Sequence, residues 1–457
     1  MKHRIIYILT AIIVFSGCSG SLDFDAERFY ASTAYAVPET NEITLRGIES
    51  SQQISVSSNC AWTFSADCDW LEVIGDDSSA SLVITADENP TDDPRICVIK
   101  LYNETQFISS ITVTQQGAER PLVSNGSESA NCYVVSQRGN YKFPALKGNS
   151  SSSVGDVSAV EVAWESFGTS VKPSVGDLIS MVSYYDGEIV FSTPSEFKEG
   201  NALIAAKDAA GNILWSWHIW LTDQPQEQVY FNNAGTMMDR NLGATSTARD
   251  NVGALGLLYQ WGRKDPFLGS SVIDDEMVAQ STLEWPKTIK YIETIDRLAY
   301  TCARPTTYIN DYDWSLDWVY DEKACWTTSD KDKSISDPCP SGWRVPDGGV
   351  DGVWAKALGK NTGTPPYNST KTGSDFGGIL GNESSIWYPY PGIRTSHDYE
   401  DSWKGGDMLL VGYEGNYWTA NNDDVFATVF SITRYQSIDT QDTYAHSWGL
   451  SVRCVKY

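Results

Sequence analysis

Short runs of alternating apolar and polar residues, separated by turn residues, fill positions 41–118. They include ITLRG, QISVSS, DWLEVI, SLVITA, RICVIKLY and FISSITVTQQ. In the last run Ile111 and Val113 alternate with threonines, which is the period of a half-buried strand. So many short strands in one stretch predict an antiparallel, Ig-like β-sandwich, with Trp62 and Trp70 as core aromatics.

A second series of β-type runs occupies residues 132–223 and ends in ILWSWHIWLTD. Successive side chains of a strand point to opposite faces, so Trp215 and Trp217 share one face while His218 and Trp220 share the other. Both faces are largely apolar, which predicts a central strand covered on both sides. We expect a second antiparallel β-sandwich here, with His218 as a partly buried, hydrogen-bonded histidine and not a catalytic base.

Two changes in composition mark boundaries. Residues 119–131 (ERPLVSNGSESAN) are polar, with Pro, Gly and Ser, and are predicted to form a linker. Residues 224–457 are richer in Trp, Tyr, Gly and Asp than the preceding segments and contain long irregular stretches. We expect them to form a third domain.

The N-terminus has the features of an export signal. Residues 1–17 combine a short basic start with an apolar run, Ile5 to Phe15, that is too short to span a bilayer. Small residues then precede Cys18, a pattern that resembles the bacterial lipobox, in which the cysteine becomes the lipidated first residue. We therefore expect residues 18–40 to tether the protein to the outer membrane, facing the exterior, with the lipid as sole anchor. The alternative is a soluble secreted protein.

The chain is strongly acidic, with a net charge of −26 and no basic cluster. Loss of Lys2 and Arg4 with the signal would leave −28 on the mature chain. This balance argues against nucleic acid and anionic lipid as partners. It suits an exported protein that must stay soluble.

Eight cysteines remain after Cys18, in a compartment that permits disulfides. Three precede the linker and five follow it, so without a bridge between these parts each retains at least one free thiol. No CxxC pair or Cys/His cluster in the sequence suggests zinc. Our preferred pair is Cys339–Cys454, and Cys302–Cys325 is the second.

Residues 41–118 resemble a BACON domain, a small Ig-like module of exported Bacteroidetes proteins. The resemblance is carried by AW at 61–62, DWLEV at 69–73, LVITADEN at 82–89, Arg95, and ITVTQQGA at 111–118. Carbohydrate binding has been proposed for the family. The sequence identifies no surface aromatic platform in this segment, so we expect it to act as a spacer.

Residues 224–457 contain the corner DPCPSGWRVP at 337–346 and end in SVRCVKY at 451–457. With the short motifs at the positions given below, this order resembles the Fibrobacter succinogenes major paralogous domain. The ordered motifs NCYVVS (131–136), YKFPALKGN (141–149), LWSWHIW (214–220), MDRNLGA (238–244) and YQWGRKDPF (259–267) also resemble fimbrial-tip and fimbrillin-associated lipoproteins of Bacteroidales. A Pro/Gly/Trp-rich corner, a short helix over Val353 to Leu358 and a terminal strand with Arg and Cys also resemble the C-type-lectin-like fold, which implies an α+β domain. Formylglycine-generating enzymes share that fold, but their terminal cysteine pair is absent here. The matching positions are 241–242, 259–261, 339–346, 392–394, 417–419 and 452–456.

Candidate chemistry is sparse. The chain has four histidines, and none has an arguable nucleophile partner, so we expect no enzyme activity. Asp311, Asp313 and Asp317 place oxygen ligands at intervals that could suit calcium, although a solvated acidic turn is the simpler interpretation. We expect no other cofactor. Aromatic residues in loop-like segments suit stacking on sugars or anchoring a protein, and the candidates are Tyr312, Trp314, Trp318, Trp387, Tyr388 and Tyr390.

The sequence therefore predicts a mainly β protein: two Ig-like antiparallel sandwiches followed by an α+β C-type-lectin-like domain. Its predicted function is that of a lipid-anchored surface binding protein, an adhesin or fimbrial-tip-like component that recognises a host glycan or protein. Fimbrial subunits are further candidate partners. The alternative is a carbohydrate-binding lipoprotein that serves uptake of a nutrient glycan.

Overall fold

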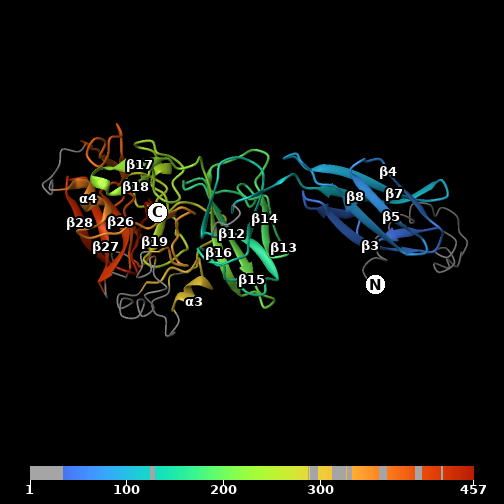
Figure 1. Ribbon diagram of the computed structural model, residues 1–457. Helices are drawn as coiled ribbons and strands as arrows, with labels where there is room; N and C mark the ends of the chain where they lie inside the picture. The colour runs from blue at the N-terminus through green and yellow to red at the C-terminus, as the bar shows by residue number, and fades with distance from the viewer. Residues whose placement is uncertain are drawn as a thin grey trace, which may run out of the picture. The chain divides into compact units, whose positions relative to one another are not determined.

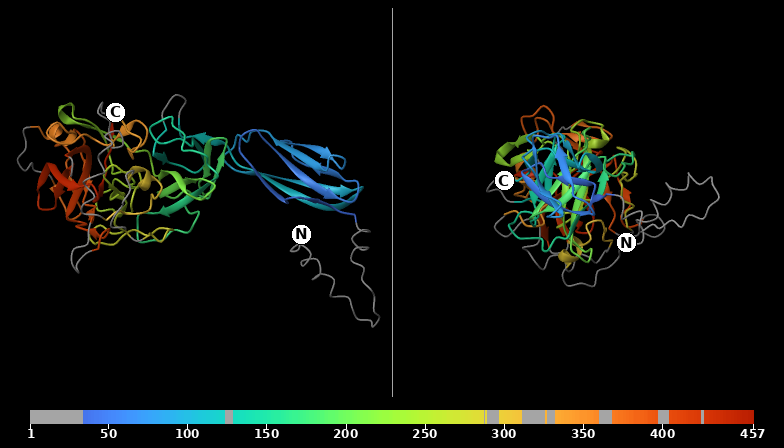
Figure 2. Two further views of the ribbon diagram at one scale, coloured as in Figure 1. Left: turned by 90° about the horizontal axis from the view of Figure 1, so that it is seen from below. Right: turned by 90° about the vertical axis from the view of Figure 1, so that its right-hand side faces the viewer.

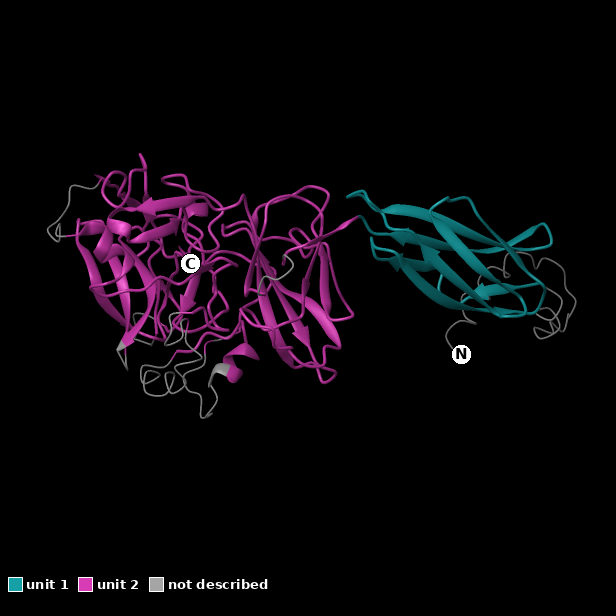
Figure 3. Cartoon of the chain, in the orientation of Figure 1, with its two compact units in different colours: residues 1–117 teal, residues 118–457 magenta. Residues whose placement is uncertain are grey.

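The structure is a computed structural model that describes residues 34–123, 129–286, 288, 297–310, 326, 332–359, 368–396, 404–423 and 426–457. It divides into two compact units, residues 1–117 and 118–457 (Figure 3). Both are built mainly from strands, which confirms the predicted fold class. In the described ranges no helix has the length and apolar character needed to cross a membrane. The signal and Cys18 lie outside these ranges, so the lipid anchor stays a prediction.

The first unit is a sandwich of two four-stranded sheets. Buried residues of both sheets, among them Leu82, Ile84, Ile99 and Ile111, meet in one core. The strand around Ile111 alternates between buried and half-buried positions, as the sequence predicts. One sheet has the order β1 (Ala36–Pro38), β3 (Ser50–Ser58), β6 (Ser81–Ala86) and β5 (Leu71–Asp76), and the other has β2 (Glu42–Leu45), β8 (Gln106–Gln115), β7 (Arg95–Asn103) and β4 (Thr63–Ala66).

A network of buried polar side chains holds the loop between β6 and β7. Asn89 Nδ2 donates to the Asp93 and Gln116 carbonyls, and Gln115 Nε2 donates to the Asp87 carbonyl at 2.7 Å. Arg95 donates to the Gln115 side chain and lies 4.5 Å above the Trp70 ring. Each buried amide is thus satisfied by backbone groups of the loop, which fixes the path of the chain there.

The second unit begins with another sandwich (Figure 1). Its sheets pack around a core that contains Phe143, Phe191, Ile204 and Trp217. The short strand β9 lies within the segment expected to be a linker, and it pairs with β11 in parallel. The sheet orders are β10 (Cys132–Val135), β16 (Ile213–Leu221), β15 (Gly200–Lys207), β12 (Ala159–Ser166), and β13 (Met181–Tyr185), β14 (Glu188–Ser192), β11 (Asn140–Pro144), β9 (Glu119–Pro121).

Strand β16 lies between two cores. Trp215, Trp217 and Ile219 pack into the core of the sandwich, whereas Trp220 belongs to a second core together with Trp418. Strand β16 has β10 on one side and β15 on the other. The predicted central strand covered on both faces is confirmed, and it explains why residues 132–223 and the C-terminal region form one compact unit.

A buried carboxylate fixes the end of β12. Glu165 is fully buried, and its carboxylate oxygens accept hydrogen bonds from the backbone N–H groups of Gly176, Leu178 and Ile179 at 2.7–2.8 Å. Three charge-assisted bonds compensate the desolvation of this anion. They hold residues 176–179 against the sandwich.

The remainder of the second unit combines small sheets, irregular segments and short helical segments (Figure 2). Helix α4 has the bounds predicted from sequence, and the α+β lectin-like character of this region stays a prediction. The helical segments are η2 (Phe231–Asn233), η3 (Val252–Ala254), α3 (Arg297–Cys302) and α4 (Val353–Leu358).

The largest sheet of this region has seven strands. Like β16, its strand β27 is covered on both faces, because Val429 packs in the core shared with Trp220 while Phe430 packs with α4. The sheets are β17 (Glu227–Tyr230), β18 (Gly235–Met238), β30 (Val455–Lys456), β20 (Trp343–Arg344); β25 (Met408–Leu409), β24 (Ile393–Arg394), β29 (Gly449–Ser451), β26 (Glu414–Asp423), β27 (Phe426–Thr433), β28 (Ile438–Ala445), with β19 (Leu258–Gln260) on β29; and β21 (Asn368–Ser369), β22 (Gly373–Asp375), β23 (Trp387–Pro389).

Candidate functional site

Three of the predicted ligand-binding aromatics are core residues. Trp387 is 5% exposed, and Tyr388 and Tyr390 are fully buried, so none of them can stack on an external ligand. The Tyr388 hydroxyl lies 2.8 Å from Trp354 Nε1 and 2.7 Å from the Tyr230 hydroxyl. The prediction was wrong for this segment because Trp387 and Tyr388 belong to strand β23, and Tyr388 and Tyr390 pack in one core with residues of α4 and β27. The other candidates, Tyr312, Trp314 and Trp318, lie outside the described residues.

Arg453, from the terminal SVRCVKY motif, packs against the buried aromatic segment at 387–390. The Arg453 guanidinium lies 3.8 Å above the Tyr388 ring and donates to Asn241 Oδ1 and to the Trp387 carbonyl. Arg453 is 1% exposed. A cation so deeply buried is stabilised by ring faces and carbonyl oxygens, which gives this motif a structural role.

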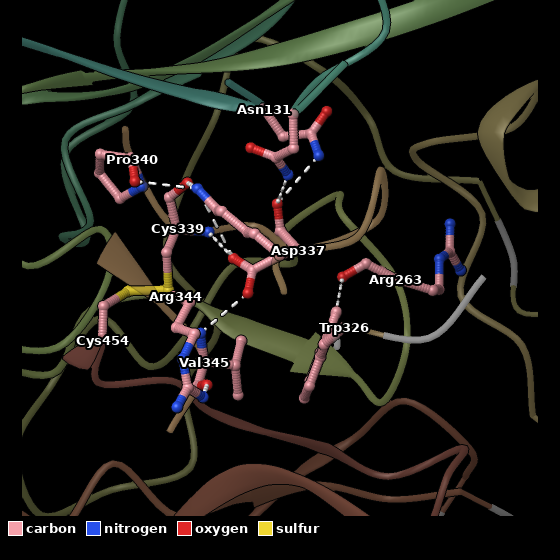
Figure 4. Close-up of a disulfide and its surroundings, with 11 residues drawn as sticks. Asn131, Arg263, Trp326, Asp337, Cys339, Pro340, Arg344, Val345 and Cys454 are labelled. Carbon is pink, nitrogen blue, oxygen red and sulfur yellow. Dashed lines mark hydrogen bonds and ion pairs between the residues drawn. A yellow bond between two sulfur atoms is a disulfide. The ribbon is translucent and has the colours of Figure 1, made fainter. Parts of the chain in front are cut away.

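The predicted Cys339–Cys454 disulfide is present, and both cysteines are fully buried (Figure 4). It joins the DPCPSGWRVP corner to the end of the chain across 115 residues. Beside it, the Asp337 carboxylate accepts backbone N–H bonds from Cys339 at 2.8 Å and Val345 at 2.9 Å. The corner is thus closed by one covalent bond and two charge-assisted hydrogen bonds.

Buried polar side chains connect the same corner to the sandwich. Asn131 Nδ2 donates to the Asp337 carbonyl (Figure 4) and to the Ile335 carbonyl. Its Oδ1 accepts from Trp215 Nε1. Lys333 Nζ donates to the Cys339 carbonyl at 2.6 Å. Burial raises the pKa of Asp337 to about 6, and the nearby Lys333 charge and the backbone N–H donors oppose this rise. The donors and acceptors of these buried residues satisfy one another, so this corner has a structural role.

Other cysteines differ from expectation. Cys302 has a free, buried thiol, which does not support the predicted Cys302–Cys325 bond, and Cys325 lies outside the described residues. In the first unit, Cys68 and Cys97 form a disulfide that the sequence did not indicate. The remaining free thiols there and in the second unit include Cys60 and Cys132.

The predicted calcium ligands Asp311, Asp313 and Asp317 lie outside the described residues, so calcium stays a prediction. Within the described ranges no group of three His, Cys, Asp or Glu side chains could hold a metal ion. His218 is 1% exposed and its Nε2 lies 2.9 Å from Asn201 Oδ1, as expected for a hydrogen-bonded core histidine. Burial lowers the pKa of His218 to about 3, so its ring is neutral at physiological pH.

An exposed aromatic cluster does occur in the second unit, at residues the sequence did not single out. Tyr413 and Tyr435 are 42% and 77% exposed, and the Arg434 guanidinium lies close to both, 4.4 Å from the Tyr413 ring centre and 5.9 Å from that of Tyr435. We refer to Tyr413, Arg434 and Tyr435 as the tyrosine–arginine cluster. Large rings exposed on a protein surface together with a cation are typical of recognition sites.

The backbone beneath this cluster is well anchored. Arg434 and Tyr435 follow β27 in the turn to β28, which is closed by a 3.0 Å bond from the Thr433 N–H to the Ser437 carbonyl. The Arg434 N–H donates to the Tyr413 carbonyl at 2.9 Å, and the Ser369 hydroxyl donates to the Arg434 carbonyl. Two loops distant in sequence are therefore joined, which holds the three side chains together. The available sequence signal was a short polar turn, RYQS, between two alternating strands.

Comparisons with known proteins identify the class of the first unit. Residues 61–116 match the family model of the BACON domain, described as "Putative binding domain, N-terminal". The chain therefore carries a BACON-type sandwich, as the resemblance implied. The resemblance of residues 224–457 to the Fibrobacter domain stays a prediction. A search of curated proteins finds no match.

Three solved structures match part of this chain. A Bacteroides ovatus GH5 xyloglucanase in complex with a XXXG heptasaccharide is 17% identical over 22% of this chain and 22% of its own length, with a TM-score of 0.18. An NMR structure of a Bacteroides thetaiotaomicron protein is 14% identical over 18% of this chain and 79% of its own, with a TM-score of 0.15. The Yersinia pseudotuberculosis adhesin InvE is 10% identical over 47% and 68%, with a TM-score of 0.16. At these TM-scores none of the three informs the function of this chain.

Proposed function

We propose that this chain is a lipid-anchored, cell-surface binding protein that recognises a host glycan or protein, as an adhesin or fimbrial-tip-like component. The observation that carries the proposal is the tyrosine–arginine cluster of the second unit. An exposed fraction of 77% for Tyr435 leaves most of a large apolar ring in water. Covering such a ring with the C–H face of a sugar or with an apolar side chain removes that surface from water, which favours binding.

The BACON-type unit, whose family is described as "Putative binding domain, N-terminal", is compatible with a surface binding protein, although the proposed binding site lies in the second unit. We propose that here it acts as a spacer that follows the lipid anchor at Cys18 and separates the second unit from the membrane. An alternative function is carbohydrate binding for a nutrient-uptake system. The same exposed rings would serve it, because sugars from either source stack on tyrosine.

Binding is tested by replacing the exposed rings. The double variant Tyr413→Ala and Tyr435→Ala should lose at least tenfold in affinity for the ligand found on a glycan and host-protein array, because buried aromatic contacts dominate interface energies. Tyr185→Ala is the matched control, since Tyr185 is 39% exposed and lies on β13 in the sandwich of the second unit, away in sequence from the cluster. If the double variant binds as tightly as the parent protein, the cluster is not the binding site.

The ligand class then separates the two functions. Binding to a host protein, or co-purification of fimbrial subunits with tagged protein, favours the adhesin. Preferential binding to a nutrient polysaccharide favours the uptake function. We further propose binding without turnover, and incubation of purified protein with the identified glycan followed by product analysis would contradict this if cleaved fragments appear.

Surface attachment has its own experiment. Cys18→Ala should move the protein from the membrane fraction to the soluble exported fraction, because the lipid is the proposed anchor. In the parent strain, external protease should digest the protein on intact cells. Protection from protease on intact cells would contradict surface exposure.

A further inference from the structure

We propose that the tyrosine–arginine cluster binds an acidic saccharide, one that carries a carboxylate or sulfate group beside the sugar face that stacks on tyrosine. This inference rests on the proposed function and specifies its ligand class. The inference starts from the position of Arg434. Its guanidinium lies over the Tyr413 ring, 4.4 Å from the ring centre, and 5.9 Å from the centre of the Tyr435 ring.

Arg434 has no anionic partner among the described residues. No ion pair and no hydrogen bond of its guanidinium occurs there; its polar contacts in those ranges involve its backbone only. Structural arginines elsewhere in the unit behave differently. Arg240 pairs with Asp223 and Asp239, and Arg344 pairs with Asp347. The guanidinium of Arg434 thus keeps its donors for an external group.

Stacking on Tyr413 leaves the Arg434 guanidinium able to bind an oxyanion. A guanidinium that packs its flat face on a ring still presents N–H donors around its edge. These donors match two oxygens of a carboxylate or sulfate, and charge-assisted pairs of this geometry are stronger than neutral hydrogen bonds. Stacking also limits the rotamers of the long side chain, which lowers the entropy lost on binding.

The two tyrosines favour a saccharide as the molecule that bears this anionic group. Their rings offer apolar faces for sugar C–H groups, and their hydroxyl groups can exchange hydrogen bonds with sugar hydroxyls. The chain as a whole carries a net charge of −26, so diffuse attraction of anions to its surface is absent. An acidic ligand would therefore be retained through the local pairing with Arg434 and not through general electrostatic adsorption.

The test compares acidic glycans with neutralised forms of the same glycans. The probes are oligogalacturonate, hyaluronan and sulfated heparan-type oligosaccharides, each paired with its methyl-esterified or desulfated form. At least one acidic member should bind 10- to 100-fold more tightly than its neutral partner, the range expected for hydrogen bonds to a charged group. Arg434→Gln should abolish this difference, and Arg434→Lys should restore only part of it because lysine lacks the planar fork.

Arg304→Gln is the matched control. Arg304 is exposed where Arg434 is half-buried, and like Arg434 it lies over a tyrosine ring, 4.1 Å from the centre of Tyr300, but outside the cluster. It should leave the preference for acidic forms unchanged, and thermal unfolding should show that all variants are folded. The inference is overturned if acidic and neutral forms bind equally, or if Arg434→Gln keeps the preference for acidic forms. The proposed function still stands in that case, provided that the tyrosine variants weaken binding. Loss of every tyrosine effect overturns the proposed function itself.

Discussion

Removing the Cys339–Cys454 disulfide should destabilise the second unit strongly. The bond closes a loop of 115 residues, and the loop-entropy relation gives about 4.8 kcal/mol for a loop of this length. The same relation gives about 3.6 kcal/mol for Cys68–Cys97, whose separation is 29 residues. Since domains unfold with only about 5–15 kcal/mol, the first loss is a large fraction of the stability of the unit.

Tryptophan fluorescence can follow this effect during urea unfolding. Of 17 tryptophans, two (Trp62 and Trp70) lie in the first unit, so 17 minus 2, or 15, belong to the second. With a denaturant slope of about 3 kcal/mol per molar urea, the double variant Cys339→Ala and Cys454→Ala should unfold at a urea concentration about 1.5 M lower. Alanine avoids leaving two buried hydroxyl groups without partners.

The matched control is Cys68→Ala with Cys97→Ala. It should leave the main fluorescence transition in place, because that disulfide closes a loop in the other compact unit. A Cys339/Cys454 variant whose midpoint stays within about 0.3 M of the parent value would refute the reasoning. It would mean that the Asp337 and Asn131 hydrogen bonds hold the corner without the covalent bond.

Three further predictions concern buried polar groups. Glu165→Gln should lower the free energy of unfolding by roughly 2–4 kcal/mol in urea unfolding. The glutamine NH₂ group would face backbone N–H donors that bond to a carboxylate oxygen in the parent protein. An unchanged urea midpoint would contradict this. Asn131→Ala should cost roughly 1–3 kcal/mol, because it removes the side-chain partner of the Ile335 carbonyl and of the Trp215 indole N–H, while the Asp337 carbonyl keeps its bond from Asn149 Nδ2; a loss below about 0.5 kcal/mol would argue against the connection. Acid should also destabilise the second unit. Burial lowers the pKa values of His218 and His446 to about 3, so below about pH 6.5 the unfolded chain binds protons that the folded chain does not. At pH 5 this costs roughly 2 kcal/mol per histidine, while Asp337, with its raised pKa, offsets roughly 1 kcal/mol, and His446→Phe should flatten the decline of the urea midpoint from pH 7 to pH 5.

Strand periodicity explains why the two sandwiches could be predicted. Alternation at Ile111 and Val113 and the two-faced apolar pattern around Trp217 are local properties, and each reports burial directly. The Cys68–Cys97 bond could not be predicted in this way. Disulfide connectivity depends on which strands become neighbours, and spacing along the chain does not determine it.

The aromatic residues show where such reasoning stops. Trp387 and Tyr388 stand in a short segment rich in Pro and Gly, which is typical of a loop, yet they are buried. Tyr388 is buried in a core with residues of α4 and β27, which come from other parts of the chain. A Gly373 side chain would collide with the Trp387 ring, so the close approach of β22 to β23 depends on glycine. Nothing in the local pattern distinguishes a ring in such a strand from a ring in an exposed turn.

The position of the exposed cluster follows from the way the second unit is built. Strands β16 and β27 each separate two cores, and both contribute to the core that contains Trp220 and Val429. Tyr435 lies in the turn that follows β27, outside both cores, and its neighbour Arg434 is fixed to the Tyr413 loop by a backbone hydrogen bond. Because a rigid support lowers the entropy cost of binding, we propose the recognition surface on this turn and not on the buried aromatic segment at 387–390.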